Sequence, residues 1–117
     1  MRNPELIYKI ALAETVAEAR ESGTFAGMPI DAQDGYIHLS TAAQLPETLA
    51  LHFCGQGGLV LLAVRSADLG TALRWEPSRG GQLFPHLYAP LAMSAITHAA
   101  PVAVAADGSC ALPEWVR

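Results

Sequence analysis

One stretch of seven residues decides the fold, and it reads Gly35-Tyr36-Ile37-His38-Leu39-Ser40-Thr41. Its polar and apolar residues alternate, so the tyrosine, histidine and serine point to one face of a strand and the isoleucine and leucine to the other. Thr41 and Gln44 have the spacing of a capping box, in which the threonine oxygen accepts a hydrogen bond from a free backbone N–H. The stretch predicts a strand that runs directly into a helix, which we expect to extend to about Cys54.

The residues before this stretch predict one strand and one helix. Leu6–Ile10 is a short apolar run rich in β-forming residues, which indicates a strand. Apolar residues then recur at helical spacing from Ala11 to Ser22, and Gly23 is a typical C-terminal stop for such a helix. The glycine, proline and aspartates of Thr24–Asp34 predict a loop.

The residues after it carry mainly strand patterns. Leu59–Val64 is continuously apolar, which predicts a strand buried on both faces. Asp107-Gly108 is a strong hairpin signal, so we expect Ser109–Leu112 to return as an antiparallel strand. The other expected strands are Leu73–Glu76, Leu83–Ala89 and Met93–Ala105. With about six or seven strands and two main helices in the N-terminal half, the sequence predicts an α+β fold with a mostly antiparallel, split sheet.

Length and composition limit the function. The 117 residues fit a single domain, 1–117, and 51% hydrophobic with only 15% charged residues excludes disorder. The net charge is −4 and no two basic residues are adjacent, which argues against nucleic acid as the main partner. No apolar run approaches the roughly 20 residues of a membrane span. Cys54 and Cys110 lack metal-ligand spacing, so we expect a cytoplasmic protein with two reduced, buried thiols.

Polar residues on the predicted strands are candidates for a binding or catalytic site. Exposed sheet faces usually carry Lys, Glu and Thr, whereas these strands carry His, Tyr, Ser and Arg, which donate and accept hydrogen bonds to ligands. His38, His86 and Glu76 are the candidate acid–base residues, and Arg74 is a candidate anchor for an anion. The remaining candidate ligand contacts on these strands are Tyr36, Ser40, Thr41 and Tyr88.

Structural roles for the same residues stay open. Ser40 and Thr41 fit helix N-caps, Arg74 and Glu76 fit an exposed ion pair, and a half-buried His38 fits a bond to a backbone carbonyl. His38, His86 and Glu76 could converge on a metal, but no metal-ligand spacing supports this, and we expect no metal site. Prolines on both sides of His86 predict an edge strand. His52 and His98 lack partners and are expected to be structural.

The motifs together resemble the DUF952 family of small bacterial proteins. The resemblance covers residues 6 to about 98 and rests on Ile7-Tyr8-Lys9-Ile10, the stretch quoted first, Leu73-Arg74-Trp75-Glu76 and the run from Phe84 to Leu91. More remotely, the order of elements is similar to the ADP-ribosyltransferase-like fold group. That similarity implies that Lys9 lies near the first-strand His or Arg of the group, and that Ser40 and Thr41 match the step that braces a nicotinamide ring. The chain departs from the pattern because Lys replaces His or Arg and because Glu76 precedes the late strand.

Three functions remain open at this point. The first is an enzyme of the ADP-ribosyl-transfer type, or a binder of NAD or an ADP-ribose-like ligand, with His38 orienting a ribose hydroxyl and His86 or Glu76 moving a proton. The second is a module that binds a small polar metabolite without turnover. The third is a protein-interaction domain that uses an exposed sheet edge near His86. The sequence does not determine the oligomeric state.

Overall fold

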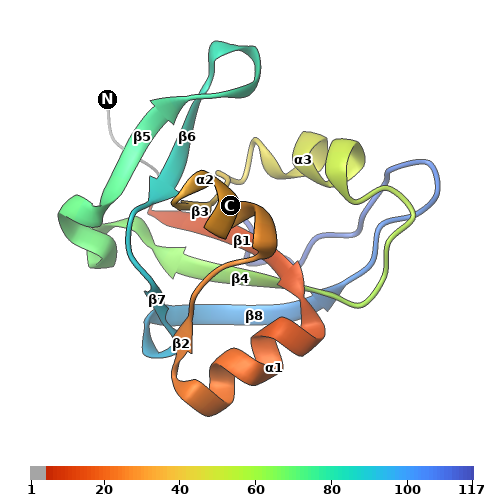
Figure 1. Cartoon of the computed structure of the whole chain (residues 1–117). Helices are drawn as coiled ribbons and strands as arrows, with labels where there is room; N and C mark the ends of the chain where they lie inside the picture. The colour runs from red at the N-terminus through yellow and green to blue at the C-terminus, as the bar shows by residue number, and fades with distance from the viewer. Residues whose placement is uncertain (1–4) are drawn as a thin grey trace.

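The computed structural model describes residues 5–117 and contains two three-stranded antiparallel sheets (Figure 1). The first sheet has the order β1-β4-β8 and the second β3-β6-β5, while β2 and β7 form a separate pair. The strands of the first sheet are β1 (Leu6–Leu12), β4 (Leu59–Arg65) and β8 (Ile96–Val102). Those of the second are β3 (Ile37–His38), β5 (Leu73–Pro77) and β6 (Leu83–Leu87), and the small pair is β2 (Thr24–Phe25) and β7 (Leu91–Ala92).

The two larger sheets meet at the end of the stretch 35–41. The Tyr8 N–H donates to the Ser40 carbonyl at 2.8 Å, and the Ser40 N–H donates to the Tyr8 carbonyl at 2.9 Å. This single antiparallel bridge joins β1 to the segment that follows β3. The mostly antiparallel, split sheet of an α+β fold, predicted from the sequence, is therefore confirmed.

Within residues 5–117, three α-helices lie in the first half of the chain, one more than expected. They are α1 (Ala13–Ser22), α2 (Pro29–Asp34) and α3 (Leu45–His52), and short 3-10 turns η1 (Ser66–Ala72), η2 (Arg79–Gly81) and η3 (Met93–Ala95) lie further along. The loop expected over Thr24–Asp34 was wrong, because this segment forms β2 and α2. Pro29 begins α2, and the Asp31 carboxylate accepts a hydrogen bond from the Met28 N–H at 2.6 Å, which caps the helix.

The reciprocal hydrogen bonds of the expected capping box form, but they lie in the turn before α3, which begins at Leu45 with Gln44 as its N-cap. The Thr41 N–H donates to Oε1 of Gln44 at 3.0 Å, and the Gln44 N–H donates to Oγ1 of Thr41 at 3.3 Å. Nε2 of Gln44 also donates to the Leu83 carbonyl at 2.9 Å, which ties the start of α3 to β6. These bonds fix how the stretch 35–41 turns from the second sheet into the helix.

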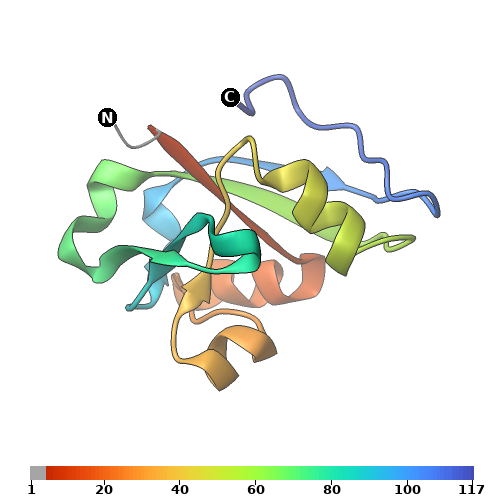
Figure 2. The same ribbon diagram turned by 90° about the horizontal axis from the view of Figure 1, so that it is seen from above.

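β4 is the middle strand of the first sheet, and its side chains pack in two hydrophobic cores. Leu62 and Val64 pack in the core that contains α1 and the apolar face of the second sheet. Leu59 and Leu61 pack in the core that lies under α3, on the opposite face. The continuous apolar run predicted such a strand, buried on both faces, and the pairing of β4 with both β1 and β8 confirms it. Figure 2 shows the first sheet from above, with the helices distributed around it.

The C-terminal hairpin expected from Asp107-Gly108 was wrong. The turn itself forms, since the Ser109 N–H donates to Oδ1 of Asp107 at 2.9 Å and the Ala105 N–H to the Ser109 carbonyl at 2.8 Å. No strand follows over Ser109–Leu112. The chain instead runs on to Trp115, whose ring stacks on Tyr8 with 6.3 Å between centroids.

Two other features concern the expected cellular setting. Cys54 is exposed and Cys110 is partly exposed, so the expected burial of both thiols was wrong. Within residues 5–117, every helix is too short or too polar to cross a bilayer.

Candidate functional site

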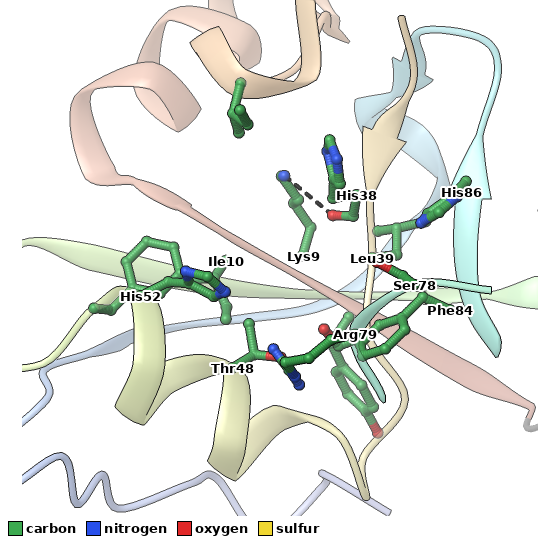
Figure 3. A pocket seen from close by; sticks show the side chains of 14 residues that line it. Lys9, Ile10, His38, Leu39, Thr48, His52, Ser78, Arg79, Phe84 and His86 are labelled. Carbon is green, nitrogen blue, oxygen red and sulfur yellow. Dashed lines mark hydrogen bonds between the residues drawn. The ribbon is translucent and has the colours of Figure 1, made fainter. Parts of the chain in front are cut away.

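A pocket of about 470 Å³ lies where the first sheet, the second sheet, α3 and the turn between β5 and β6 come together (Figure 3). Its floor includes side chains from β1 and from the stretch 35–41, and its rim includes side chains from α3 and η2. The complete lining is Tyr8, Lys9, Ile10, Ile30, His38, Leu39, Ser40, Thr48, His52, Phe53, Ser78, Arg79, Phe84 and His86.

Asp31, which the sequence analysis placed in a loop, organises the polar groups behind the pocket. Its carboxylate is almost fully buried and accepts hydrogen bonds from the backbone N–H groups of Met28 and His38, at 2.6 and 3.0 Å. Burial acts to raise the pKa of Asp31, but the hydrogen bond from His38 and the charge and hydrogen bond of Lys9 outweigh it and lower the pKa to about 2. The spacing of Pro29 and Asp31 was the available sign of a capped helix.

Lys9 lines the pocket, but its ammonium group is held by the protein. Nζ lies 2.8 Å from Oδ2 of Asp31 and donates to the His38 carbonyl at 3.1 Å (Figure 3). Burial lowers the pKa of Lys9, while the neighbouring carboxylate opposes that shift. A buried ammonium paired in this way contributes mainly its carbon stem to the pocket wall.

Both ring nitrogens of His38 face carboxylates. Nδ1 is 2.6 Å from Oδ1 of Asp31, and Nε2 is 2.9 Å from Oδ2 of Asp34. Carboxylate oxygens only accept hydrogen bonds, so both contacts are complete when the imidazole carries both protons. In this arrangement His38 has no ring nitrogen left for a ligand, although its side chain lines the pocket.

His86 is the buried histidine that keeps a free nitrogen. Nδ1 lies 2.8 Å from Oε1 of Glu76, and the same oxygen accepts a hydrogen bond from the Tyr88 hydroxyl at 2.7 Å. The hydrogen bond from Tyr88, followed by that from His86, lowers the pKa of Glu76 despite some desolvation. Within residues 5–117, Nε2 of His86 has no hydrogen-bond partner.

The free nitrogen of His86 is not fully enclosed. The residue is 3% exposed and lines the pocket. No side-chain nitrogen or oxygen of residues 5–117 is both fully enclosed and unpaired, so Nε2 keeps access to solvent. The same reasoning applies to the hydroxyl of Ser40, which is 6% exposed, lines the pocket and makes no side-chain hydrogen bond within the described chain.

The strand register places the polar residues on one face of the second sheet. His86 of β6 lies opposite His38 of β3 on one side and opposite Arg74 of β5 on the other. The Tyr36 ring stacks on the His86 ring with 4.1 Å between centroids, and the Arg74 guanidinium lies 4.6 Å from the Tyr88 ring centroid. Alternation correctly placed the polar residues on one side of each strand, and the pairing of β3, β6 and β5 brings these sides together.

That face divides into two parts, which the sequence did not distinguish. Of the predicted site residues, four line the pocket, namely Lys9, His38, Ser40 and His86. The other five lie outside its lining, namely Tyr36, Thr41, Arg74, Glu76 and Tyr88. The edge strand expected around His86 was wrong, because β6 is the middle strand of its sheet.

The rim contains residues that the sequence analysis did not select. Nε of Arg79 lies 3.2 Å from Oε1 of Glu47, and its NH2 group donates to Oγ1 of Thr48 at 3.1 Å. The Arg79 guanidinium also lies 5.0 Å from the Phe84 ring centroid. His52, expected to be structural, is exposed at this rim and lines the pocket.

Two further observations concern the remaining candidates. His98 lies outside the pocket and stacks on Trp115 with 5.0 Å between ring centroids. In the part of the chain that the structure describes, residues 5–117, no group of three or more His, Cys, Asp and Glu side chains is arranged to hold a metal ion.

The sequence matches the model of a family described as "Protein of unknown function (DUF952)" over residues 10–99. The chain belongs to the DUF952 family. The matched residues include every candidate site residue except Lys9, which directly precedes them. No curated protein matches this DUF952 sequence.

Solved structures of another protein, CC0527 from Caulobacter crescentus, share the fold of this DUF952 chain. A crystal structure of CC0527, a structural genomics target, is 48% identical, and the match covers 91% of this chain and 93% of that chain with a TM-score of 0.86. A solution NMR structure of CC0527 is 50% identical and covers 88% of this chain and 89% of that chain with a TM-score of 0.79.

Proposed function

We propose that this DUF952 protein binds a small phosphate-bearing molecule of the nucleotide type, such as NAD or ADP-ribose, in the pocket between the two sheets. The observation that carries this proposal is the chemistry of the pocket lining. Its ionisable side chains, tyrosine aside, are Lys9, His38, His52, Arg79 and His86, and no carboxylate lines it. Two of the seven Lys and Arg residues and three of the four histidines line this cavity.

The carboxylates that pair with these basic groups lie outside the pocket lining. Asp31 and Asp34 contact Lys9 and His38, and Glu47 pairs with Arg79 at the rim. The groups left to meet a ligand are mainly hydrogen-bond donors, including the unused N–H groups of Arg79. Arginine binds phosphate oxygens well because its N–H groups form a rigid, permanently charged fork.

The remaining side chains of the pocket lining favour a ligand that contains an aromatic ring. Aromatic and aliphatic side chains from both sheets and from α3 form the walls, and the volume lies within the range of small-molecule sites, roughly 300–1,000 Å³. A base or nicotinamide ring would pack on such walls, as Phe84 already does with the Arg79 guanidinium.

An ADP-ribosyltransferase-like activity is the enzymatic form of this proposal. It is supported by the order of elements, in which β1 is followed by α1 with Gly23 as its C-cap and, after β2 and α2, β3 leads through Ser40 and Thr41 to α3. The Ser40 hydroxyl is available to a nicotinamide ring, whereas the Thr41 hydroxyl serves the capping box. His86 would then move the proton or stabilise the developing charge.

Isothermal titration calorimetry with NAD, ADP-ribose, AMP and adenosine tests this proposal. We expect saturable binding of the phosphate-bearing compounds and weaker binding of adenosine, which has no phosphate. His86→Gln should reduce binding, whereas His98→Gln, outside the pocket, should not. Absence of binding at millimolar concentration, in protein whose fold is verified by circular dichroism, would refute the proposal.

A binding module without turnover is the second candidate. It is favoured by the fixed pairing of Lys9 and of both His38 nitrogens, which leaves few groups free for chemistry. Incubation with NAD distinguishes the two, since an enzyme would release nicotinamide over time. Binding without release of nicotinamide, at a protein concentration equal to that of NAD, would assign the module.

A further inference from the structure

We infer that Nε2 of His86 is held as a proton-accepting lone pair, positioned by Glu76 and Tyr88, and that it receives a hydroxyl of the ligand at the pocket floor while the anionic end lies at Arg79. This inference rests on the proposed function, because it assigns the orientation of a ligand in the same pocket. It predicts a ligand with a sugar-type hydroxyl at one end and a phosphate at the other.

The hydrogen bonds around Glu76 determine which nitrogen of His86 carries the proton. Oε1 of Glu76 accepts from the Tyr88 hydroxyl and also lies 2.8 Å from Nδ1 of His86. An ionised carboxylate only accepts hydrogen bonds, so Nδ1 must be the donor of this contact. In the neutral imidazole the other nitrogen, Nε2, then carries the lone pair.

Packing fixes the direction of that lone pair. The Tyr36 ring stacks on His86 at 4.1 Å, and Tyr36 also lies 5.1 Å from the Tyr88 ring, measured between centroids. His86 is 97% buried, so its ring cannot rotate without displacing these neighbours. Glu76 and Tyr88 are positioning residues in this scheme, because they act on the ligand only through His86.

A buried acceptor without a partner is the second observation. Nε2 of His86 and the Ser40 hydroxyl are both polar, nearly buried and unpaired within residues 5–117. No fully enclosed side-chain nitrogen or oxygen of residues 5–117 is unpaired, so both groups reach water in the free protein, and a ligand hydroxyl that donates to Nε2 would replace that water. A phosphate oxygen has no proton to donate at neutral pH and would meet the lone pair unfavourably.

The opposite end of the pocket has the opposite preference. Arg79 uses Nε and NH2 on Glu47 and Thr48, which orients the guanidinium across the rim and leaves its other N–H groups unpaired within the described chain. Phosphate oxygens would accept hydrogen bonds from these N–H groups. The proposed orientation therefore places the hydroxyl of a nucleotide at His86 and its phosphate at Arg79.

The first test measures the tautomer of His86 in the free protein. Nitrogen-15 NMR at pH 8.5, well above the ordinary histidine pKa of about 6.5, should show Nδ1 protonated and Nε2 unprotonated. His52, which makes no hydrogen bond within residues 5–117, is the reference inside the same molecule. Glu76→Ala should shift His86 toward the tautomer ratio of His52, whereas Tyr88→Phe should retain the wild-type tautomer.

The second test compares AMP with 2′,3′-dideoxy-AMP by calorimetry. Loss of the ribose hydroxyls should weaken binding to the wild type about fivefold to tenfold, the effect of one hydrogen bond, and should have a smaller effect on His86→Phe. Arg79→Gln should weaken both compounds equally. Equal binding of both compounds by the wild type would overturn the orientation.

The outcomes separate this inference from the function on which it rests. A wild-type His86 protonated at Nε2, or a tautomer unchanged in Glu76→Ala, would overturn the inference even if nucleotides bind. Absence of AMP binding to a protein with the expected tautomer would overturn the proposed function and the ligand orientation, and would leave only the positioning by Glu76.

Discussion

Replacement of Asp31 by Asn is expected to destabilise the fold strongly. The carboxylate is buried at the junction of β1, α2 and β3, where it accepts from the backbone of Met28 and His38 and pairs with Lys9. Asn has nearly the same shape but one acceptor oxygen. The NH2 group of the asparagine side chain must therefore face one of the N–H donors that now bond to the Asp31 carboxylate. In addition, Lys9 keeps a buried positive charge without a counter-charge.

The magnitude follows from these two losses. An unpaired buried donor costs about 1–3 kcal/mol, and removal of one partner of a buried ion pair costs about 3–5 kcal/mol. These two costs are not additive, because Lys9 can release its proton and so remove its buried charge. We therefore expect Asp31→Asn to lower the free energy of unfolding by about 3–5 kcal/mol, a large share of the stability of a typical domain.

The acid limb of the stability curve gives a second measure. The pKa of Asp31 falls from 3.8 to about 2 on folding, so its ionisation contributes stability that is complete above pH 4 and is lost as the pH falls through 2. A shift of this size corresponds to about 2 kcal/mol. The difference between wild type and Asp31→Asn should therefore shrink by about 2 kcal/mol between pH 5 and pH 2.

Urea unfolding followed by the fluorescence of the two tryptophans measures both quantities. Asp34→Asn is the matched control, because Asp34 is exposed and its contact with Nε2 of His38 should contribute less than about 1 kcal/mol. Lys9→Met in the Asp31→Asn background should restore part of the loss, because it removes the unpaired charge. A loss below 1 kcal/mol in Asp31→Asn, or one equal to that of Asp34→Asn, would refute the reasoning.

Three further changes have defined outcomes. Gln44→Ala removes half of the capping box and the bond to the Leu83 carbonyl, and urea unfolding should show a loss of about 1–2 kcal/mol. Gly108→Ala should cost about 1–2 kcal/mol by the same measurement, since φ is +88° and the new Cβ would lie 3.1 Å from Cβ of Ala50. Arg79→Gln should lower the affinity for ADP-ribose about tenfold by calorimetry and leave the unfolding free energy within about 1 kcal/mol of the wild type, because Glu47, its partner in the ion pair, is exposed.

Local patterns predicted much of the fold because the interactions behind them are local. The capping box joins residues three positions apart, and strand alternation places His38 and Ser40 on one face without reference to the rest of the chain. The hairpin signal at Asp107-Gly108 failed because the turn is local but the return strand is not. The chain after Ser109 contains Pro113, which has no N–H to donate to a ladder, and leads to the packing of Trp115 on Tyr8.

The site was less predictable because the lining of the pocket depends on elements that are far apart in the sequence. Alternation correctly placed Arg74 and Glu76 on the face that carries His86, but it does not say which part of that face α3 covers. Arg79 became a rim residue only through contacts with α3, more than thirty positions earlier in the chain. Asp31 was missed because a short helix resembles a loop, and because its partner Lys9 lies 22 residues away.

The two histidines on the polar face, His38 and His86, differ in how many of their ring nitrogens are paired, because a different number of carboxylates surrounds each ring. His38 has one at each nitrogen, so its imidazole serves as a link between Asp31 and Asp34. His86 has one, at Nδ1, and its other nitrogen has no hydrogen-bond partner within residues 5–117. An acidic protein can therefore present a binding site for an anion, since charges beyond about 8 Å are largely screened at physiological salt and the nearest groups determine the local potential. Some of the carboxylates that make the chain acidic pair with basic groups at the pocket, so net charge argues against a polyanion but not against the single phosphate that we propose.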